Sequence, residues 1–115
     1  MSEKTPPIIS SPLPSGAQRC LEAEWPNTTV SISIVTDEAS TCKYNTTDVV
    51  YDSMSGTFSV TGTTAHSQSL TLLCGGSFTY YTRCMDGSSN KNLSSTSVIF
   101  WLDKDPAPLR VYDIH

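Results

Sequence analysis

Residues 78–84 alternate strictly between two sets of side chains, and this alternation is the clearest structural signal in the chain. One face of an extended segment carries Phe78, Tyr80, Thr82 and Cys84, and the opposite face carries Thr79, Tyr81 and Arg83. A period of two residues is typical of a β-strand with one buried side. We therefore predict a central strand here, against which the rest of the chain packs.

Several other short segments have the same period or a similar apolar content. They cover residues 8–9, 30–35, 42–45, 57–60, 70–72 and 97–102. Turn-forming residues separate these segments at intervals of about 8 to 12 residues, and no segment has a helical period. This spacing predicts an all-β fold, a two-layer antiparallel β-sandwich of about seven strands.

A chain of 115 residues and 12.5 kDa has room for one domain. We expect three parts: a Pro-rich N-terminal segment with a short edge strand at residues 1–16, the sandwich at 17–103, and a C-terminal extension at 104–115. Within the second part, residues 17–27 lack a strand period and are expected to form an irregular loop around Cys20 and Trp25.

Composition restricts the partners of the chain. Its net charge is −4 and its seven Lys and Arg residues are scattered, so the phosphates of a nucleic acid would be repelled. No apolar run is long enough to span a bilayer, and the N-terminus lacks the basic and apolar regions of a signal peptide. We expect a soluble chain whose export signal has been removed or lies in a longer parent protein.

The four cysteines stand at wide intervals, at positions 20, 42, 74 and 84. They form no Cys-x-x-Cys pair, and His66 and His115 lie far from them in the sequence, so a structural zinc site is disfavoured. If the strand between Cys74 and Cys84 is extended, these two cannot bond, because ten residues at about 3.3 Å each hold the sulfurs too far apart. Two pairings remain, and either implies an oxidising compartment.

Three segments carry a recognisable pattern. They are Thr-Asp-Glu-Ala-Ser-Thr-Cys-Lys-Tyr at 36–44, Phe-Ser-Val-Thr-Gly at 58–62 with His66 and Ser67, and Tyr-Tyr-Thr-Arg-Cys-Met-Asp at 80–86 followed by Asn90 and Asn92. Together they resemble fibronectin type III-like (immunoglobulin-like) modules of bacterial surface and secreted proteins, from about Pro6 to Leu102. The resemblance implies a β-sandwich that is extracellular or on the cell surface. Such modules serve as spacers, adhesion units and carbohydrate-associated appendages.

The resemblance also implies how the cysteines pair. In such a module the strand of Cys42 begins beside the end of the strand of Cys84, and the first inter-strand loop shares a pole with the turn before the central strand. We therefore expect the bonds Cys42–Cys84 and Cys20–Cys74, at opposite poles. Phe78 stands where fibronectin-like domains often have a Tyr whose hydroxyl fixes the preceding corner. We hypothesise that the Cys20–Cys74 bridge compensates for that missing hydrogen bond.

The sequence carries no pattern that points to catalysis. Neither histidine is flanked by a motif that would orient a nucleophile, and there is no Gly-x-Ser-x-Gly elbow. His66 is interpreted as a polar residue in a connection between strands. Asp37, Glu38 and Asp86 lack the spacing of a calcium loop and are interpreted as solvated loop charges. We expect a chain that is not an enzyme and that holds no metal and no cofactor.

Aromatic side chains are the candidates for ligand binding, because sugar rings stack on exposed aromatic faces. The candidates are Trp25, Tyr51, Tyr81, Trp101 and Tyr112. The simpler alternative is that Trp101 and Tyr81 pack on flanking segments and that Trp25 fills the rim of the core. Asn27, Asn45 and Asn92 each begin an Asn-x-Ser/Thr triplet, which matters only in a host with glycosylation machinery.

The C-terminal extension contains a candidate assembly strand. Residues 109–114 mix apolar and polar side chains, and Leu109, Val111 and Ile114 are its apolar positions. Such a segment pairs with a neighbouring copy by strand addition, builds a fibre, or folds back on its own sheet; a plain linker is the simpler interpretation. We therefore expect a non-catalytic structural or binding module, whose partner is another protein, a neighbouring copy or a glycan.

Overall fold

The computed structural model describes residues 5–21 and 25–105 of the chain. The strands in this part are β1 (Ile9–Leu13), β2 (Gly16–Leu21), β3 (Asn27–Thr36), β4 (Ser40–Asn45), β5 (Gly56–Thr57), β6 (Ala65–Leu73), β7 (Ser77–Asp86) and β8 (Thr96–Asp105). One short 3-10 turn, η2 (Tyr51–Ser53), lies between β4 and β5. The predicted all-β sandwich is confirmed, with eight strands in the described part where about seven were expected.

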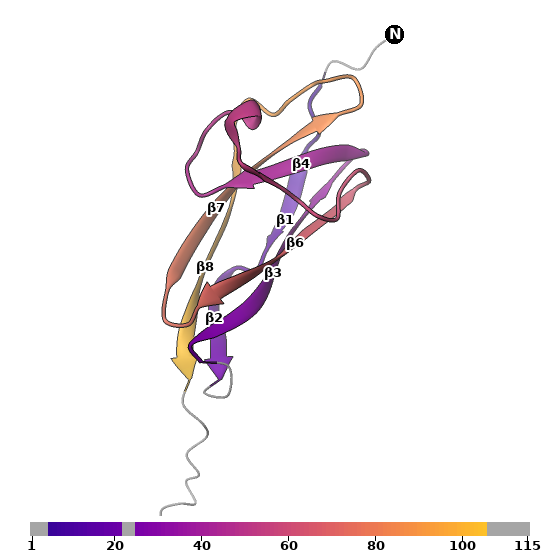
Figure 1. Cartoon of the computed structure of the whole chain (residues 1–115). Helices are drawn as coiled ribbons and strands as arrows, with labels where there is room; N and C mark the ends of the chain where they lie inside the picture. Colours follow the sequence, from indigo (N-terminus) through magenta and orange to yellow (C-terminus); the bar gives the residue numbers. More distant parts are fainter. Residues whose placement is uncertain (1–4, 22–24, 106–115) are drawn as a thin grey trace, which may run out of the picture.

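The strands form two packed sheets, which Figure 1 shows as two layers. One sheet has the order β1-β3-β6, and the other has the order β2-β8-β7-β4-β5. Among the described strands, every pairing is antiparallel except that of β2 with β8, so the prediction of a purely antiparallel sandwich is wrong here. The reason is that the chain crosses from one sheet to the other between β1 and β2 without reversing, and β2 therefore lies beside β8 in the same direction.

Strand β2 occupies much of the region for which an irregular loop was expected. Gln18 and Cys20 point towards the core, whereas the residues between and beside them are exposed. Parallel pairing with β8 holds this short strand, and a partner strand so distant in sequence leaves no local signal. Strand β8 itself extends to Asp105, two residues past the expected end of the sandwich at residue 103.

Strand β6 includes His66, which the sequence analysis placed in a connection. The strand pairs with β3 along its whole length, from Ala65 beside Val35 to Leu73 beside Asn27. His66 is only 1% exposed, so its interpretation as a polar connecting residue is wrong. Polar residues occupy both faces of the strand from Ser67 to Ser69, and for this reason hydrophobicity does not mark its first half.

The core lies between the sheets and is built from alternate residues of the longer strands. Strand β7, predicted as the central strand, lies inside the five-stranded sheet between β8 and β4. Its inward residues Tyr80, Thr82 and Cys84 are buried. The largest fully buried side chains of this core include Ile32 and Ile34 from β3 in the other sheet, Val98, Phe100 and Leu102 from β8 beside β7, and Phe58.

Both expected disulfides are present, in opposite halves of the sandwich. Cys42 and Cys84 are register partners on β4 and β7, with their Cα atoms 4.0 Å apart, so this bridge lies within one sheet. Cys20 on β2 is bonded to Cys74, the residue after β6, with Cα atoms 5.8 Å apart, and this bridge ties the two sheets together. Two disulfides indicate an oxidising environment.

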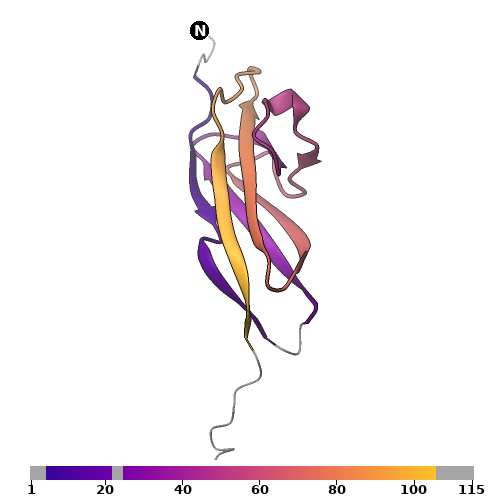
Figure 2. The same ribbon diagram turned by 90° about the vertical axis from the view of Figure 1, so that its left-hand side faces the viewer.

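The chain enters and leaves the sandwich at opposite ends. We call the end that holds residues 5–8 the N-terminal pole and the end where β8 finishes at Asp105 the C-terminal pole. Figures 1 and 2 show the two poles at the top and the bottom of the domain, with β8 running between them.

Candidate functional site

Two of the five aromatic candidates pack against other parts of the domain, Tyr51 as a buried residue and Trp25 as a half-buried one. Tyr51 in η2 is 5% exposed, and the ammonium group of Lys43 lies 4.6 Å from the centre of its ring. Trp25 packs against the core, and its indole Nε1–H donates to the carbonyl of Cys20 at 3.0 Å. Trp25 thus fills the rim of the core, as the simpler interpretation proposed. Tyr112 and the assembly positions Leu109, Val111 and Ile114 lie outside the described residues.

Trp101 and Tyr81 lie on the outer face of the five-stranded sheet. Trp101 is 42% exposed, while its neighbours Phe100 and Leu102 are buried, so alternate residues of β8 face outward. In the sheet, Trp101 is the register partner of Ala17 on β2 and of Ser77 on β7. Both neighbours have small side chains, so they do not cover the indole ring. Figure 2 shows β7 and β8 side by side on this face.

Further along the same face, apolar and hydroxyl side chains stand side by side. Ile99 is 53% exposed and is the register partner of Thr79, and Tyr81 is half-buried opposite Ser97. Alternate residues of a strand repeat at about 6.7 Å, so Trp101, Ile99 and Ser97 form one row along β8. This outer row of β8 thus places the exposed indole ring of Trp101 and the exposed side chain of Ile99 beside the hydroxyl groups of Ser77 and Thr79 on β7.

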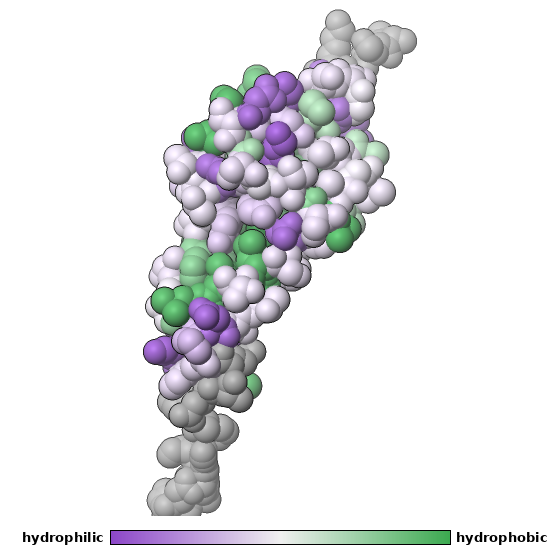
Figure 3. All heavy atoms as spheres, viewed as in Figure 1, coloured by the Kyte–Doolittle hydropathy of each residue, from purple (hydrophilic) through white to green (hydrophobic). Residues whose placement is uncertain are grey.

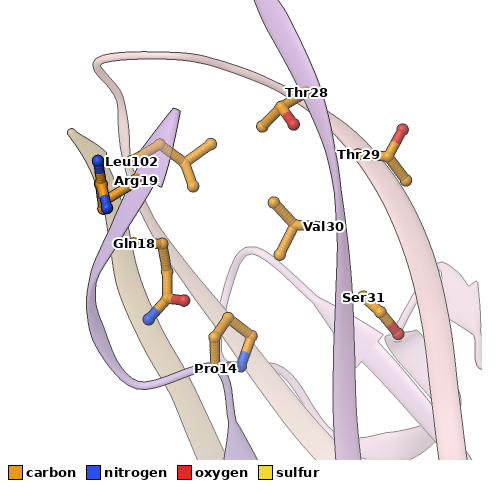
Figure 4. A pocket seen from close by; sticks show the side chains of 8 residues that line it. All are labelled: Pro14, Gln18, Arg19, Thr28, Thr29, Val30, Ser31 and Leu102. Atoms are coloured by element: carbon orange, nitrogen blue, oxygen red, sulfur yellow. The ribbon is translucent and has the colours of Figure 1, made fainter. Parts of the chain in front are cut away.

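A cleft of about 280 Å³ opens between β2 and β3 on the side of the domain. It exists because β1 pairs with β3 only from Thr36 to Ser33, so no described strand covers this edge of β3 between Asn27 and Ile32. Figure 4 shows Thr28 and Val30 pointing from β3 towards the cleft, with Gln18 opposite and Pro14 at one end. The lining offers hydroxyl and amide groups around a few apolar side chains.

A second cleft, of about 290 Å³, lies at the N-terminal pole beside Asp86. The carboxylate of Asp86 accepts from the backbone N–H groups of Ser88 (2.8 Å) and Asn90 (2.9 Å) and from the side-chain amide of Asn90 (2.9 Å). These bonds, above all the one from the Asn90 side chain, lower the pKa of Asp86. Asp86 is 3% exposed, so it caps its own turn and is not the solvated charge that the sequence suggested.

His66 is the centre of a buried polar network between the sheets. Its Nε2 lies 2.8 Å from Thr36 Oγ1 and its Nδ1 lies 2.6 Å from Thr61 Oγ1. The Thr36 hydroxyl donates to the carbonyl of Glu38 at 2.8 Å, so it accepts from His66, and the ring proton belongs on Nε2. Nδ1 is then the acceptor for Thr61. Burial lowers the pKa of His66, and the neutral ring completes this network.

Two further residues, to which the sequence analysis assigned no structural role, fix the N-terminal pole. Asn92 accepts from the backbone N–H of Cys84 and donates to the carbonyl of Pro7, both at 2.7 Å. Arg83 is 8% exposed and forms an ion pair with Asp48 at 2.9 Å, and this bond lowers the pKa of the Asp48 carboxyl. Both residues are polar positions on loops or outward strand faces, where a sequence pattern predicts exposure.

The three Asn-x-Ser/Thr triplets differ in their surroundings. Both polar atoms of Asn92 are engaged, as described above, and Asn45 accepts from Ser55 and donates to the carbonyl of Thr47. Asn27 is exposed at the start of β3. Among the three, Asn27 therefore has the most accessible side chain.

Neither a known family nor, among the described residues, a metal-binding cluster gives this chain a function. No protein-family model matches the sequence, and a search of curated proteins finds no match. Within residues 5–21 and 25–105, there is no helix with the length and hydropathy to cross a membrane. The same part of the chain has no group of three or more His, Cys, Asp or Glu residues that could hold a metal ion.

Proposed function

We propose that this chain is a non-catalytic structural module of an extracellular or cell-surface protein, and that it serves as a spacer between neighbouring parts. The observation that carries this proposal is the path of the chain, which enters at one pole and leaves at the other (Figures 1 and 2). A module with this path adds its length to whatever it connects. The two disulfides support the location, because such bonds persist outside reducing compartments.

The sheet order supports a fibronectin type III-like or immunoglobulin-like module. In those folds the first two strands and the fifth share one sheet, and the third, sixth and seventh share the other. If β2 is left out of the count, β1, β3 and β6 are the first, second and fifth strands, and they share one sheet. Strands β4, β7 and β8 are then the third, sixth and seventh, and they lie in the other sheet. One feature differs: antibody domains join the two sheets by a bridge to the sixth strand, whereas Cys84 on β7 is bonded within its own sheet.

The spacer proposal is tested by the shape and mass of the protein in solution. Sedimentation velocity on the single chain, and small-angle X-ray scattering on one copy and on two copies joined in tandem, measure both. We expect a monomer, and a tandem pair whose longest dimension is about twice that of one copy. A tandem pair folded back on itself would contradict the proposal. A stable oligomer that disappears when residues 106–115 are removed would instead favour assembly through Leu109, Val111 and Ile114.

A second candidate function is glycan binding on the outer row of β8, favoured by the exposure of Trp101 and Ile99. A glycan array screened with the whole chain tests it. Binding that is lost in Trp101→Ala but kept in Leu93→Ala would support it, because Leu93 is 90% exposed and stands outside this row. An array with no signal above background would remove this candidate and leave the spacer proposal intact.

A further inference from the structure

The two strands that continue towards the ends of the chain are direct neighbours and run in the same direction. Strand β2 follows β1 from the N-terminal pole, and β8 is the last strand before the chain leaves at the C-terminal pole (Figure 2). Their six register pairs run from Gly16 beside Phe100 to Leu21 beside Asp105. A pull on the two ends of the chain therefore reaches this ladder directly through β8 and, once β1 has separated from β3, through β2.

The direction of that pull relative to the ladder decides how the ladder breaks. Once β1 has separated from β3, a pull on the N-terminus drags β2 by its first residue towards the N-terminal pole, and a pull on the C-terminus drags β8 by its last residue the opposite way. Both forces act along the strands, whereas the backbone hydrogen bonds run between them. All bonds of the ladder are then strained at once. A pull across the strands would break them one at a time.

The bridge of Cys20 prevents β2 from peeling away at the other end. Cys20 lies opposite Lys104 near the end of β2, and its partner Cys74 sits in the turn before β7. That turn is itself fixed to β8, because the N–H of Gly75 donates to the carbonyl of Leu102 at 2.7 Å and the N–H of Leu102 donates to the carbonyl of Gly76 at 2.9 Å. The end of β2 is thus held covalently beside the strand it pairs with.

The same bridge sets the length of the chain after the ladder has broken. Cys20 and Cys74 are 54 residues apart, and the covalent path between the ends bypasses the residues between them. Cys42 and Cys84 are 42 residues apart, and the path through their bridge is longer, so the Cys20–Cys74 bridge alone sets the limit. Residues 21–73 cannot be drawn out while that bridge is intact.

We infer that this domain is a connector under tension, in which the parallel β2–β8 ladder resists a pull on the chain ends and the Cys20–Cys74 bridge limits the extension once the ladder breaks. The inference goes beyond the proposed spacer role, because a spacer needs length but not resistance to force. The kind of parent it fits is a chain anchored at one end and pulled at the other.

The extension limit is tested by single-molecule force spectroscopy on the whole chain, held by its two ends. Removing both bridges is expected to lengthen the unfolded chain by 54 residues, about 180 Å at ~3.4 Å per residue. Cys20→Ser/Cys74→Ser alone is expected to add only 12 residues, the difference between 54 and 42, or about 40 Å. Cys42→Ser/Cys84→Ser is expected to add nothing. Any other order of these lengths would overturn the assignment of the limiting bridge.

The resistance of the ladder is tested by two substitutions at neighbouring positions, Ala17→Pro and Gln18→Pro, and the second is read against Gln18→Ala because Gln18 is half-buried whereas Ala17 is exposed. Proline removes a backbone N–H, and neighbouring residues of a strand direct their N–H groups to opposite edges. One variant therefore loses a hydrogen bond to β8, and the other loses an N–H on the open edge and serves as its control. At constant force, the variant that loses a hydrogen bond to β8 should unfold about fivefold faster than the variant that loses only an N–H on the open edge. Equal rates in the two variants would overturn the inference.

A change in the direction of pull tests the same point without altering the ladder. Ser88 lies in the β7–β8 turn at the N-terminal pole. Handles on the N-terminus and on Ser88→Cys no longer drag β8 by its last residue, and we expect a lower unfolding force than between the two chain ends. Equal forces in the two directions would contradict a role for the ladder. A weak domain that is still an elongated monomer in solution would remove this inference and leave the spacer proposal standing.

Discussion

Buried polar groups hold the N-terminal pole of the sandwich, whereas apolar side chains and a covalent bridge hold the C-terminal pole. At the N-terminal pole, His66 joins Thr36 on β3 to Thr61 in the segment before β6, and Asn92 joins the entering chain at Pro7 to Cys84 on β7. Each of these side chains satisfies buried donors or acceptors from two different segments. The pole is therefore fixed by hydrogen bonds that depend on specific residues.

The C-terminal pole has fewer strands and a more apolar interior. Strands β1 and β4 pair only in the other half, so the edges of β3 and of the first half of β7 lack a strand partner among the described strands. Phe78 packs against Phe100 with the two rings tilted by 32° and their centres 5.5 Å apart. In Figure 3 the largest group of apolar residues on this face lies in the lower half of the domain. Half-buried core residues in this half include Leu70, Leu72 and Phe78.

The comparison indicates what each disulfide adds to its surroundings. Cys42–Cys84 joins two strands that already pair over six register positions. Cys20–Cys74 joins the two sheets in the half with open strand edges, where the hydrogen bond from Trp25 Nε1–H to the carbonyl of Cys20 also connects them. The first bridge therefore reinforces an arrangement that hydrogen bonds already specify, and the second adds a covalent link to the apolar packing and the Trp25–Cys20 hydrogen bond that join the sheets in that half.

Removing each bridge separately is the strongest way to break this comparison. In the chain-entropy model either loss costs about 4 kcal/mol of unfolding free energy, because the closed loops of 42 and 54 residues differ little. The local effects should differ. In Cys20→Ser/Cys74→Ser we expect the amides of β2 to exchange by local opening, with an opening free energy smaller than the free energy of global unfolding. In Cys42→Ser/Cys84→Ser, the amides of β4 and β7 should stay protected.

Chemical denaturation measures the global loss, and hydrogen exchange measured residue by residue locates it. Equal protection of β2 in both double variants would show that apolar packing alone holds the C-terminal pole. A loss far below 4 kcal/mol for the Cys20–Cys74 pair would also count against its role as compensation for Phe78 at the corner before β7.

Replacing Asn92 tests the polar side of the comparison. Asn92→Ala leaves the N–H of Cys84 without its side-chain acceptor and frees the carbonyl of Pro7, so we expect a loss of about 1–3 kcal/mol. Asn45→Ala is a matched control, because Asn45 also forms side-chain hydrogen bonds but at an exposed site, and its loss should be about 0.5 kcal/mol or less. Urea denaturation compares the two, and equal losses would contradict a special role for Asn92.

The two poles also differ in how well the sequence predicts them. The alternation of residues 78–84 identifies β7 because three of its four inward side chains, Phe78, Tyr80 and Cys84, are aromatic or cysteine, while its outward side chains include Thr79 and Arg83. Around His66 the same alternation is hidden, since serine, threonine and histidine side chains are buried there and satisfy one another. The parallel pairing of β2 with β8 has no local signal at all, because it follows from the path of the chain between sheets.

Lowering the pH should weaken the N-terminal pole selectively, and this is the smallest of the expected effects. Burial lowers the pKa of His66 below its ordinary value of 6.5, so the unfolded chain binds a proton more readily than the folded one. The stability that the neutral ring supplies is complete above about pH 6.5 and is lost as the pH falls towards the folded pKa. The lowered pKa values of Asp48 and Asp86 act in a separate window, below their ordinary value of 3.8. Melting temperatures measured between pH 7.5 and about pH 4 should therefore fall in the native chain. They should fall less in His66→Gln, because the amide of glutamine does not titrate. Parallel curves for the two proteins would show that the His66 network does not govern acid stability.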